Sequence, residues 1–432
     1  MLDKIKTRAQ SVVSKARGKK PNTGQYMVGL DIGTEFIKAL IGKVTDNKIE
    51  IVGTGRAHQE LSDMQAGAIS DIAAVVSNCD KALNQAEQQA GLSARGAVIG
   101  IAGELVKGTT TQVRCRRQDA DKEMDIEEVE RIIGLVQARA KERARQQLVW
   151  ELGGKEVEIR MVNSALVSIE IDGYSVTNPV GFKGKEVVVQ LYTAFAPMIH
   201  IGALERTAKE LDLDLLAVAA EPFAVSRSVI GDDPNASMSA ILMDVGGGTT
   251  DIAVINDGGV QGTKMFGIGG RAFTRSVEKD LGVTFPQAEE LKLGLSDHKL
   301  SAQKIPAIER ALSKTLEVWA SGVELALGEF TQLDNLPNRL LLCGGGSSLD
   351  MLMDKLSETS WYRELPFTRK PTVQHIQPSQ VVGIVDKTGS VTDHTFITAM
   401  GLLRVGLDTL QQQDSSFSTG SFRERIDRLL KV

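Results

Sequence analysis

Aspartate and glycine occur together at the ends of two apolar segments. "VGLDIGTEFIKA" (28–39) and "ILMDVGGGTTDIAV" (241–254) each end an expected buried strand with an aspartate, Asp31 or Asp244, and follow it with a glycine turn. Glycine turns let backbone N–H groups approach a bound oxyanion, so such turns cradle phosphate. A carboxylate beside phosphate is repelled unless a divalent cation lies between them. The two aspartates therefore predict Mg²⁺, held largely through water.

The residues that follow these aspartates supply backbone donors and hydroxyls for a phosphate. The predicted ligands are Gly33, Thr34, Gly246, Gly247, Gly248, Thr249 and Thr250. A third glycine turn, in "LLCGGGSSLDML" (341–352), has no aspartate at the end of its strand. Its Gly344, Gly345, Gly346 and Ser347 form a flat surface that suits an adenine or a ribose. One such turn is usually plain loop geometry, but three in one chain favour a nucleotide site.

Size and composition indicate a globular protein. The chain has 432 residues, enough for two to four domains, with 42% hydrophobic and 24% charged residues. No segment approaches the roughly 20 consecutive apolar residues of a spanning helix, and the N-terminus does not read as a secretory signal, so we expect a cytoplasmic protein. The net charge of −5 gives no reason to expect nucleic acid. The three cysteines lack ligand spacing and are expected to be reduced, mostly core thiols.

Strand and helix patterns alternate in both halves of the chain. We expect a hairpin around Asp46-Asn47, a helix at about 70–90, and a buried strand in "GAVIGIAG". From about 107 to 190 one charged helix lies among antiparallel strands, which is typical of an inserted α+β module. The α/β pattern then resumes, with a further helical block at about 270–332.

The three glycine turns together resemble those of the actin, Hsp70 and sugar-kinase superfamily. This resemblance implies an actin-like, two-lobed α/β ATPase fold of duplicated RNase H-like domains that binds ATP and Mg²⁺. "AAEPFAVSRSV" (219–229) resembles the superfamily's connecting helix. Its Glu221 would then act catalytically by orienting a water or Mg²⁺ near the γ-phosphate. Alternatively, Glu221 is an ordinary helix-start carboxylate stabilised by the helix dipole.

A second segment carries further resemblance to the same superfamily. In "GIGGRAFTRSVEKDLGVTFPQAEELKLG" (267–294), Gly269 and Gly270 would let the chain pass close to the nucleotide. Glu290, with Glu289 and Lys292, lies where the superfamily presents polar side chains to the ribose. The alternative is that these are solvated helix residues.

The inserted module distinguishes members of the superfamily. Asn178, Pro179, Val180, Gly181 and Phe182, followed by a further glycine, resemble the end of the inserted subdomain in the FtsA family of bacterial cell-division proteins. PilM, a pilus-assembly protein, carries a related insertion and is the closest rival. An Hsp70-type chaperone is excluded because only about 80 residues follow the third glycine turn. A sugar kinase is disfavoured because no further aspartate motif provides a catalytic base.

The resemblance implies a division of the chain into subdomains. We expect a basic amphipathic extension (1–24), a first lobe (25–94 and 196–235), an inserted α+β subdomain (95–195), a second-lobe core (236–274 and 336–406), an outer helical subdomain (275–335), a flexible linker (407–420) and an amphipathic membrane-targeting helix (421–432).

The C-terminal segment "SFRERIDRLLKV" has a helical pattern with one apolar face flanked by basic residues. Such a helix suits an anionic membrane surface. The predicted membrane residues are Phe422, Arg425, Ile426, Leu429 and Leu430. The alternative is a terminal helix docked on the protein's own core. The basic segment 1–20 is either a second, weak anchor or a disordered arm.

The FtsA resemblance implies an ATP-binding, peripheral membrane protein at the cytoplasmic face of the division site. It would bind the C-terminal tail of the tubulin-like FtsZ, an anionic lipid membrane, other copies of itself in head-to-tail filaments, and other division proteins through the inserted subdomain. At most it would be a slow ATPase. Exposed cations such as Lys292, Lys299, Lys304 and Arg310 are candidates for the acidic tail, or are simply solvated. A PilM-like assembly protein and a small-molecule kinase remain the alternatives.

Overall fold

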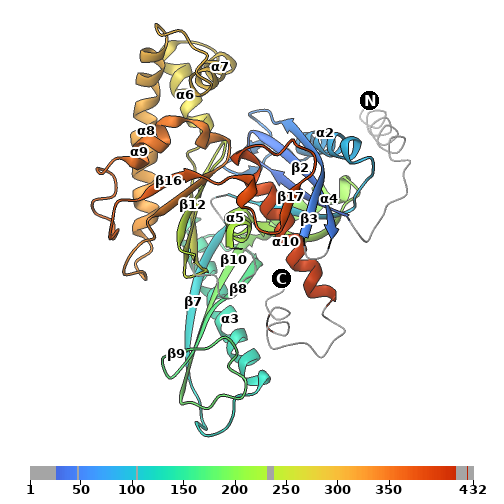
Figure 1. Ribbon diagram of the computed structural model, residues 1–432, viewed down its shortest axis with the longest axis vertical. Helices are drawn as coiled ribbons and strands as arrows, with labels where there is room; N and C mark the ends of the chain where they lie inside the picture. The colour runs from blue at the N-terminus through green and yellow to red at the C-terminus, as the bar shows by residue number, and fades with distance from the viewer. Residues whose placement is uncertain (1–25, 46–47, 104–105, 231–237, 415–425, 427–432) are drawn as a thin grey trace.

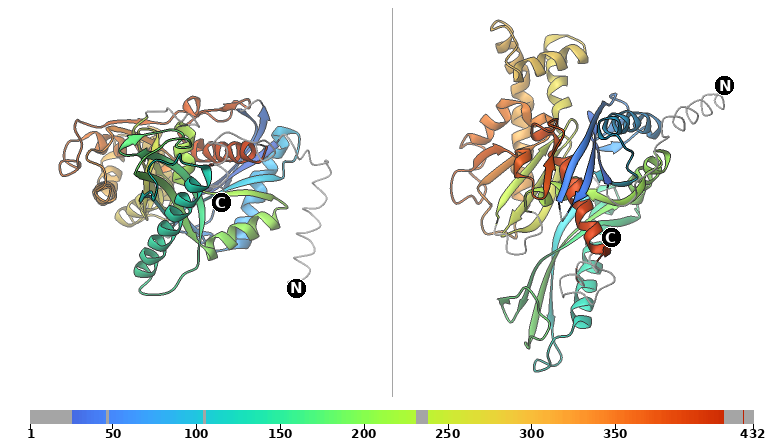
Figure 2. Two further views of the ribbon diagram at one scale, coloured as in Figure 1. Left: turned by 90° about the horizontal axis from the view of Figure 1, so that it is seen from below. Right: turned by 45° about the vertical axis from the view of Figure 1, so that its right-hand side comes forward.

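The computed structural model describes residues 26–45, 48–103, 106–230, 238–414 and 426. Two α/β lobes lie side by side, and a narrow subdomain of strands and one helix projects from them (Figure 1; Figure 2, right). A group of helices forms the opposite end of the molecule (Figure 1). In the described part of the chain, no helix is both long enough and apolar enough to span a membrane.

The first lobe is built on one mixed sheet. Among the described residues it contains six strands in the order β11-β6-β1-β2-β3-β17. β1, β2 and β3 are antiparallel neighbours, whereas β6 and β11 continue the sheet in parallel. The strands are β1 (Tyr26–Ile32), β2 (Phe36–Thr45), β3 (Lys48–His58), β6 (Gly96–Ile101), β11 (Asp214–Ala220) and β17 (Ile384–Asp386). A separate small hairpin consists of β4 (Met64–Gln65) and β5 (Ala68–Ile69).

The second lobe repeats this strand arrangement. β12, β13 and β14 are antiparallel neighbours, and β15 and β16 follow in parallel on the other side of β12. The strands are β12 (Ala240–Val245), β13 (Thr250–Asn256), β14 (Gly259–Phe266), β15 (Arg339–Cys343) and β16 (Thr372–His375). The same order in both lobes is what a duplicated domain predicts.

The sheet of the second lobe extends into the projecting subdomain. β14 meets β7 at the single pair Gly262 and Thr109, and β10, β8 and β9 complete the sheet. One helix, α3, packs against β7 and β10. These elements are β7 (Lys107–Arg116), α3 (Ile126–Glu151), β8 (Ile159–Ile171), β9 (Tyr174–Ser175) and β10 (Glu186–Pro197).

Helices cover both lobes. Asp71 starts α2 because its carboxylate accepts a hydrogen bond from the Ala74 backbone N–H (3.1 Å), and Gly91 ends it in the left-handed conformation that glycine favours. The first-lobe helices are α2 (Ile72–Ala90), α4 (Met198–Glu210), α5 (Glu221–Ile230) and α10 (Ile397–Asp414). The second-lobe helices are α6 (Gly270–Leu281), α7 (Phe285–Ser296), α8 (Ile305–Gly328) and α9 (Asp350–Ser357).

Three predicted boundaries differ from the structure. β6, which was assigned with residues 95–195 to the inserted subdomain, pairs with β1 and β11 in the first lobe. β17 and α10, which fall largely in the segment 336–406 assigned to the second lobe, pack on β3 and β1 of the first. α10 also continues to Asp414, so the first half of the predicted linker 407–420 is helical. Local sequence patterns do not predict these assignments, because pairing with elements far apart in the sequence determines the lobe to which an element belongs.

The largest apolar core joins the first lobe to the second-lobe sheet and to the inserted subdomain, through residues such as Leu40, Leu242 and Tyr192. Further cores lie in the second lobe and in the inserted subdomain. Ile426, from the C-terminal segment, is 1% exposed and belongs to the core of the inserted subdomain. It lies with α3 residues such as Val129 and Ile133 and with β10 residues such as Val189. The described C-terminal residue is therefore packed on the protein itself.

Candidate functional site

The first aspartate of the site is paired with a lysine. Asp31 near the end of β1 lies directly opposite Lys38 on β2, so both side chains emerge on one face of the sheet. Lys38 Nζ is 2.9 Å from Asp31 Oδ2, and both side chains are nearly excluded from solvent. Burial by itself lowers the pKa of Lys38, but the charge and hydrogen bond of Asp31, together with the charge of Asp244, outweigh it, so the pKa lies above its ordinary value. The two side chains thus form a buried salt bridge.

The second aspartate occupies the corresponding place in the other lobe. Asp244 near the end of β12 lies opposite Asp251 on β13, where the first lobe has lysine. The Thr398 hydroxyl donates to Asp244 Oδ2, and Thr249 Oγ1 donates to Asp251 Oδ2 (3.0 Å). Burial raises the pKa of both carboxyls, to about 7 for Asp251. The charge of Asp31 raises the pKa of Asp244 further.

Glu221 joins these aspartates. It is the first residue of α5 and is buried. Burial raises the pKa of Glu221 well above its ordinary value, and the charges of Asp31, Asp251 and Asp244 raise it further. The structure thus brings Glu221 and the two predicted aspartates into one electrostatic cluster that draws on both lobes. Such a concentration of carboxylates favours binding of a cation.

The glycine turns of the two lobes approach each other beside this cluster. A Cβ atom at Gly248 would lie 2.9 Å from Thr34 Oγ1, and one at Gly247 would lie 2.8 Å from the Glu35 Cβ atom. Side chains at these positions would therefore push the lobes apart. The close approach gives a physical reason for glycine at both positions.

One ion pair joins the two lobes at this point. Arg271 on α6 donates from Nε to Glu35 Oε2 (2.6 Å), and His58 Nε2 lies 2.9 Å from Glu35 Oε1. The backbone N–H groups of Gly270 and Arg271 donate to the carbonyls of Gly246 and Gly247 (2.9 and 2.8 Å). Since α6 begins on the second glycine turn, its arginine reaches across to the first.

The third glycine turn closes against Asp244. Gly344 has φ 81°, and a Cβ atom there would lie 2.1 Å from Asp244 Oδ1, so the position requires glycine. Gly345 faces open space, and Gly346 packs against Val245 and Gly246. The predicted flat surface is therefore open at Gly345.

A histidine pair lies behind the third turn. His375 and His394 stack with ring centroids 3.9 Å apart. His375 Nε2 lies 2.9 Å from the Ser347 carbonyl oxygen, and His394 Nε2 lies 3.1 Å from Ser348 Oγ. Burial lowers the pKa of His394 to about 4, and the neighbouring His375 contributes in the same direction.

The hydroxyl groups of two predicted ligands already form hydrogen bonds within the protein. The Thr250 hydroxyl donates to the Ile268 carbonyl (2.7 Å) and accepts from Trp319 Nε1 (2.9 Å), and Thr250 is fully buried. The Ser347 hydroxyl, also fully buried, donates to the Gly344 carbonyl (2.8 Å). These two hydroxyls are thus used within the protein, and a nucleotide contact of Thr250 or Ser347 stays a prediction.

The segment after the second turn also differs from expectation. Gly269 packs on Gly246, where its Cβ atom would lie 2.6 Å from the carbonyl oxygen. Lys292 is buried and donates to the Gly270 carbonyl (3.2 Å), Thr274 Oγ1 (2.8 Å) and Glu289 Oε2 (2.8 Å). Its three donors are therefore engaged, which excludes it as a surface contact for an acidic tail.

Glu290, the predicted ribose ligand, is exposed on α7. Its neighbour Glu289 instead points inward and accepts hydrogen bonds from Thr274 and Lys292. The structure therefore does not bring Glu290 into the carboxylate cluster.

The donor set fits magnesium bound together with a phosphate. In the parts of the chain that the structure describes, no three histidine, cysteine, aspartate or glutamate side chains could hold a metal ion by themselves. Mg²⁺ commonly takes one or two carboxylates and completes its shell with water and phosphate oxygens. Asp31 and Asp244 are the residues that would hold it, and the ion would screen them from the phosphates.

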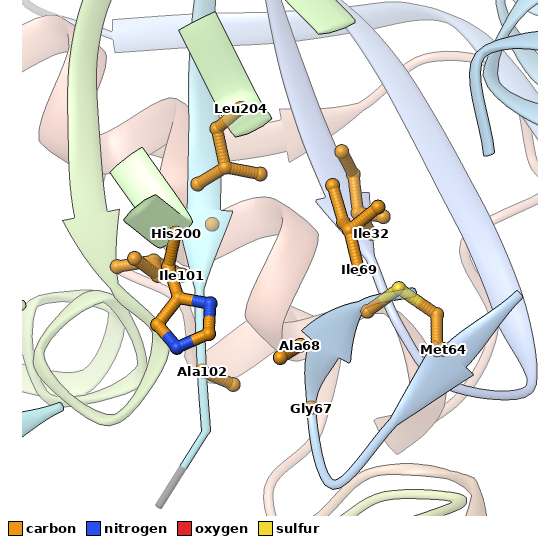
Figure 3. Close-up of a pocket in the computed structure, with 10 residues that line it drawn as sticks. Ile32, Met64, Gly67, Ala68, Ile69, Ile101, Ala102, His200 and Leu204 are labelled. Carbon is orange, nitrogen blue, oxygen red and sulfur yellow. The ribbon is translucent and has the colours of Figure 1, made fainter. Parts of the chain in front are cut away.

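An apolar pocket lies close to the site but is separate from it. It is formed by the ends of β1 and β6, the β4–β5 hairpin and α4 (Figure 3). Its lining includes Ile32, Met64, Ile69, Ile101 and His200. Burial lowers the pKa of His200, so this wall of the pocket is largely uncharged. The lining contains none of the predicted ligands.

The predicted membrane residues fall mostly outside the described residues. Phe422, Arg425, Leu429 and Leu430 lie outside the described residues, as does the extension 1–24. Ile426 is buried in the core of the inserted subdomain. This contact corresponds to the alternative in which the terminal segment docks on the protein, and the membrane role of the segment stays a prediction.

Known proteins provide an independent comparison. The family described as cell division protein FtsA matches residues 241–401. FtsA of Pseudomonas aeruginosa is 26% identical over 424 residues, which covers 92% of this chain and 93% of the relative. The chain is thus similar to this FtsA protein along most of its length. FtsA of Bacillus subtilis is also 26% identical, over 274 residues that cover 63% of this chain and 58% of the relative.

The fold comparison agrees with the predicted architecture. The structure of a PilM–PilN type IV pilus biogenesis complex superposes with a TM-score of 0.63 at 15% identity, covering 88% of this chain and 98% of that chain. At this identity the likeness concerns the fold alone. The predicted actin-like fold and the FtsA resemblance are thus confirmed.

Proposed function

We propose that the chain is an ATP-binding, actin-like peripheral membrane protein of the bacterial division ring. In this proposal it tethers FtsZ filaments to the cytoplasmic face of the membrane and polymerises head to tail. The relationship to the FtsA family along 92% of the chain supports a role in division.

One observation carries the nucleotide part of the proposal. Asp31 and Asp244, from equivalent strands of the two lobes, belong to one carboxylate cluster beside glycine turns that nearly touch. A nucleotide held there with Mg²⁺ contacts both lobes at once. Its binding free energy therefore favours one relative orientation of the lobes. Because filament contacts depend on that orientation, nucleotide binding would control assembly.

Assembly in turn would strengthen membrane binding. A single short amphipathic segment such as 421–432 binds lipid only marginally, by analogy with a lone acyl chain. In a filament many such segments act together, and the effective concentration of each is high. The protein can then serve as a tether with little or no ATP hydrolysis.

The outer helices α6 to α8 are the proposed site for the FtsZ tail. Lys299, Lys304 and Arg310 are exposed there. Titration calorimetry with an FtsZ C-terminal peptide tests this step, with Lys304→Glu/Arg310→Glu as the variant and Arg139→Glu/Arg143→Glu, an equal charge change on the inserted subdomain, as the control. We expect saturable binding that the first variant weakens and the control leaves unchanged. Absence of binding, with and without Mg-ATP, would exclude the tether function.

A PilM-like assembly function is the second candidate, because the superposition covers 98% of the PilM–PilN structure's chain. The two candidates differ in the peptide that they bind. Calorimetry with an N-terminal PilN peptide under the same conditions separates them. Binding of that peptide together with no affinity for the FtsZ tail would favour the pilus function.

A further inference from the structure

The helix α3 of the inserted subdomain has one outward face of unusual composition. Its buried face packs on β7 and β10 through residues such as Ile132 and Val136. On the outward face, Leu135, Arg139 and Arg143 follow one another at intervals of four residues, and Trp150 lies seven residues further on. These spacings place the four side chains in one stripe along the helix. We refer to these four residues as the α3 stripe.

The apolar members of the α3 stripe are in contact with water. Leu135 is 52% exposed and Trp150 is 81% exposed. The other two of the chain's three tryptophans, Trp319 and Trp361, are 0% and 5% exposed. An indole ring costs free energy when it is left in water, and exposed aromatic and apolar groups that cluster commonly mark an interaction surface.

The charged members of the stripe are uncompensated. Within the described residues, neither Arg139 nor Arg143 forms an ion pair or a side-chain hydrogen bond. The nearby carboxylate of Glu142 is already engaged, because Arg145 donates to both of its oxygens (2.9 and 3.1 Å). Arg145 also pairs with Glu156. The carboxylates of Glu142 and Glu156 therefore pair with Arg145, which lies beside the α3 stripe, and not with the arginines of the stripe.

We propose that the α3 stripe is a second membrane-contact surface that binds anionic lipid headgroups. This inference rests on the proposed peripheral membrane function and adds a contact independent of the terminal segment 421–432. Arginine pairs with lipid phosphates, and tryptophan prefers the interface, where its ring is apolar and its N–H remains hydrated. An acidic protein segment would neutralise the arginines but offers no general reason to bury Trp150 and Leu135.

The position of the subdomain supports this assignment. α10, after which the chain continues toward the terminal segment, points its carboxyl end toward the inserted subdomain in two views (Figure 1; Figure 2, right). Ile426 of that segment packs against the buried side of α3. The segment predicted to bind lipid is therefore attached at the same end of the molecule as the stripe. While Ile426 is buried, the stripe still faces outward and can contact a membrane.

Trp150 provides a direct probe in the full-length protein. Because the other two tryptophans are buried, iodide quenching of the fluorescence reports mainly on Trp150. We expect phosphatidylglycerol vesicles to shift the emission to the blue and to lower quenching at least threefold, whereas phosphatidylcholine vesicles leave both unchanged. A Leu429→Glu/Leu430→Glu variant, which disables the terminal segment, keeps this protection at saturating lipid.

Charge removal gives the matching affinity test. Arg139→Gln/Arg143→Gln should weaken the affinity for phosphatidylglycerol vesicles, measured by sedimentation, about 30-fold, since each cation near an anionic surface contributes roughly fivefold. Arg363→Gln/Lys370→Gln, with the same charge change at exposed positions between α9 and β16, should have no effect. Circular dichroism establishes that each variant is folded.

Three other outcomes would contradict the proposal that the α3 stripe binds lipid. If the wild-type protein sediments with anionic vesicles while Trp150 stays fully quenchable, the stripe does not contact lipid, although the proposed membrane function stands. If no vesicle binds the wild-type protein, both proposals fail. Protection of Trp150 by polyglutamate but not by vesicles would reassign the surface to an acidic protein partner.

Discussion

Arg271 of the second lobe donates a hydrogen bond from Nε to Glu35 Oε2 of the first lobe, at 2.6 Å. Glu35 directly follows the first glycine turn, and Arg271 is the second residue of the helix that begins on the second turn. Both side chains are largely buried, at 11% and 19% exposure. The ion pair therefore joins the lobes next to the carboxylate cluster.

Removal of this ion pair should loosen the closed arrangement of the lobes. Arg271→Ala is expected to accelerate dissociation of a fluorescent ATP analogue by about 5- to 100-fold, the range for loss of one partly buried charged contact. Stopped-flow displacement measures this rate. Arg275→Ala, at an exposed position on the same helix, is the control. Equal rates for the wild-type protein and Arg271→Ala would show that the contact does not restrain the cleft.

Lys38 should matter for stability because it compensates a buried charge. Lys38→Met leaves Asp31 unpaired, and breaking a buried pair costs about 3–5 kcal/mol of unfolding free energy. The double variant Asp31→Asn/Lys38→Met should recover much of this loss, because no uncompensated charge remains. Urea denaturation measures both effects, with Lys43→Met on the same strand as control. A double variant no more stable than Lys38→Met would show that the charge pairing is unimportant.

Glu221 is expected to serve hydrolysis rather than nucleotide binding. It is buried among the carboxylates but lies on α5, outside the glycine turns. Glu221→Gln should keep ATP affinity within about threefold and slow single-turnover phosphate release about 100-fold or more, the usual contribution of a positioned acid–base group. Asp214→Asn, at an exposed position on β11, is the control. If Glu221→Gln releases phosphate at the wild-type rate, Glu221 has no role in hydrolysis and is an ordinary carboxylate at the start of a helix.

His394 should make stability depend on pH below neutrality. Burial, followed by the nearby His375, lowers the pKa of His394 to about 4 in the folded protein, from an ordinary value of 6.5. Above pH 6.5 neither state binds this proton, but between pH 6.5 and 4 only the unfolded chain does, so stability falls as pH falls. Since the ring is partly exposed, we expect a loss of about 1–2 kcal/mol.

The variant His394→Gln isolates this contribution. The unfolding free energies of this variant are measured from urea curves at pH 7.5, 6, 5 and 4. As the pH falls, they should converge on the wild-type values or exceed them. His298→Gln, whose side chain is 80% exposed, serves as control. A constant difference between wild type and His394→Gln across this range would contradict the prediction.

The parts of the site that depend on local sequence could be predicted. Asp31 and Asp244 were identified because a strand-ending aspartate before glycine is a local pattern. Lys38 was missed because the turn between β1 and β2, which places it opposite Asp31, was not predicted. Thr398 could not have been found, because it reaches Asp244 from 154 residues away. No local pattern indicates that contact.

Contacts between distant elements also affect one predicted ligand and one predicted boundary. Thr250 has the residue type and position of a phosphate ligand, but Trp319 on α8 and the Ile268 carbonyl use its hydroxyl. The sequence of β6 predicts a buried strand but does not indicate the lobe to which the strand belongs. Its pairing with β1 assigns it to the first lobe. Local sequence thus predicts which elements form, whereas contacts between distant elements decide which side chains remain available.

We propose that Asp31 and Asp244 together hold one magnesium ion of a bound nucleotide. Calorimetric ATP affinities with Mg²⁺ and with EDTA test it in the wild-type protein, Asp31→Asn, Asp244→Asn and the double variant, with Asp257→Asn as an exposed-turn control. We expect Mg²⁺ to strengthen wild-type binding about tenfold or more and each single variant to lose most of that gain. Because the two residues share one ion, the double variant should lose little more. Magnesium-dependent binding that survives in the double variant would contradict the account.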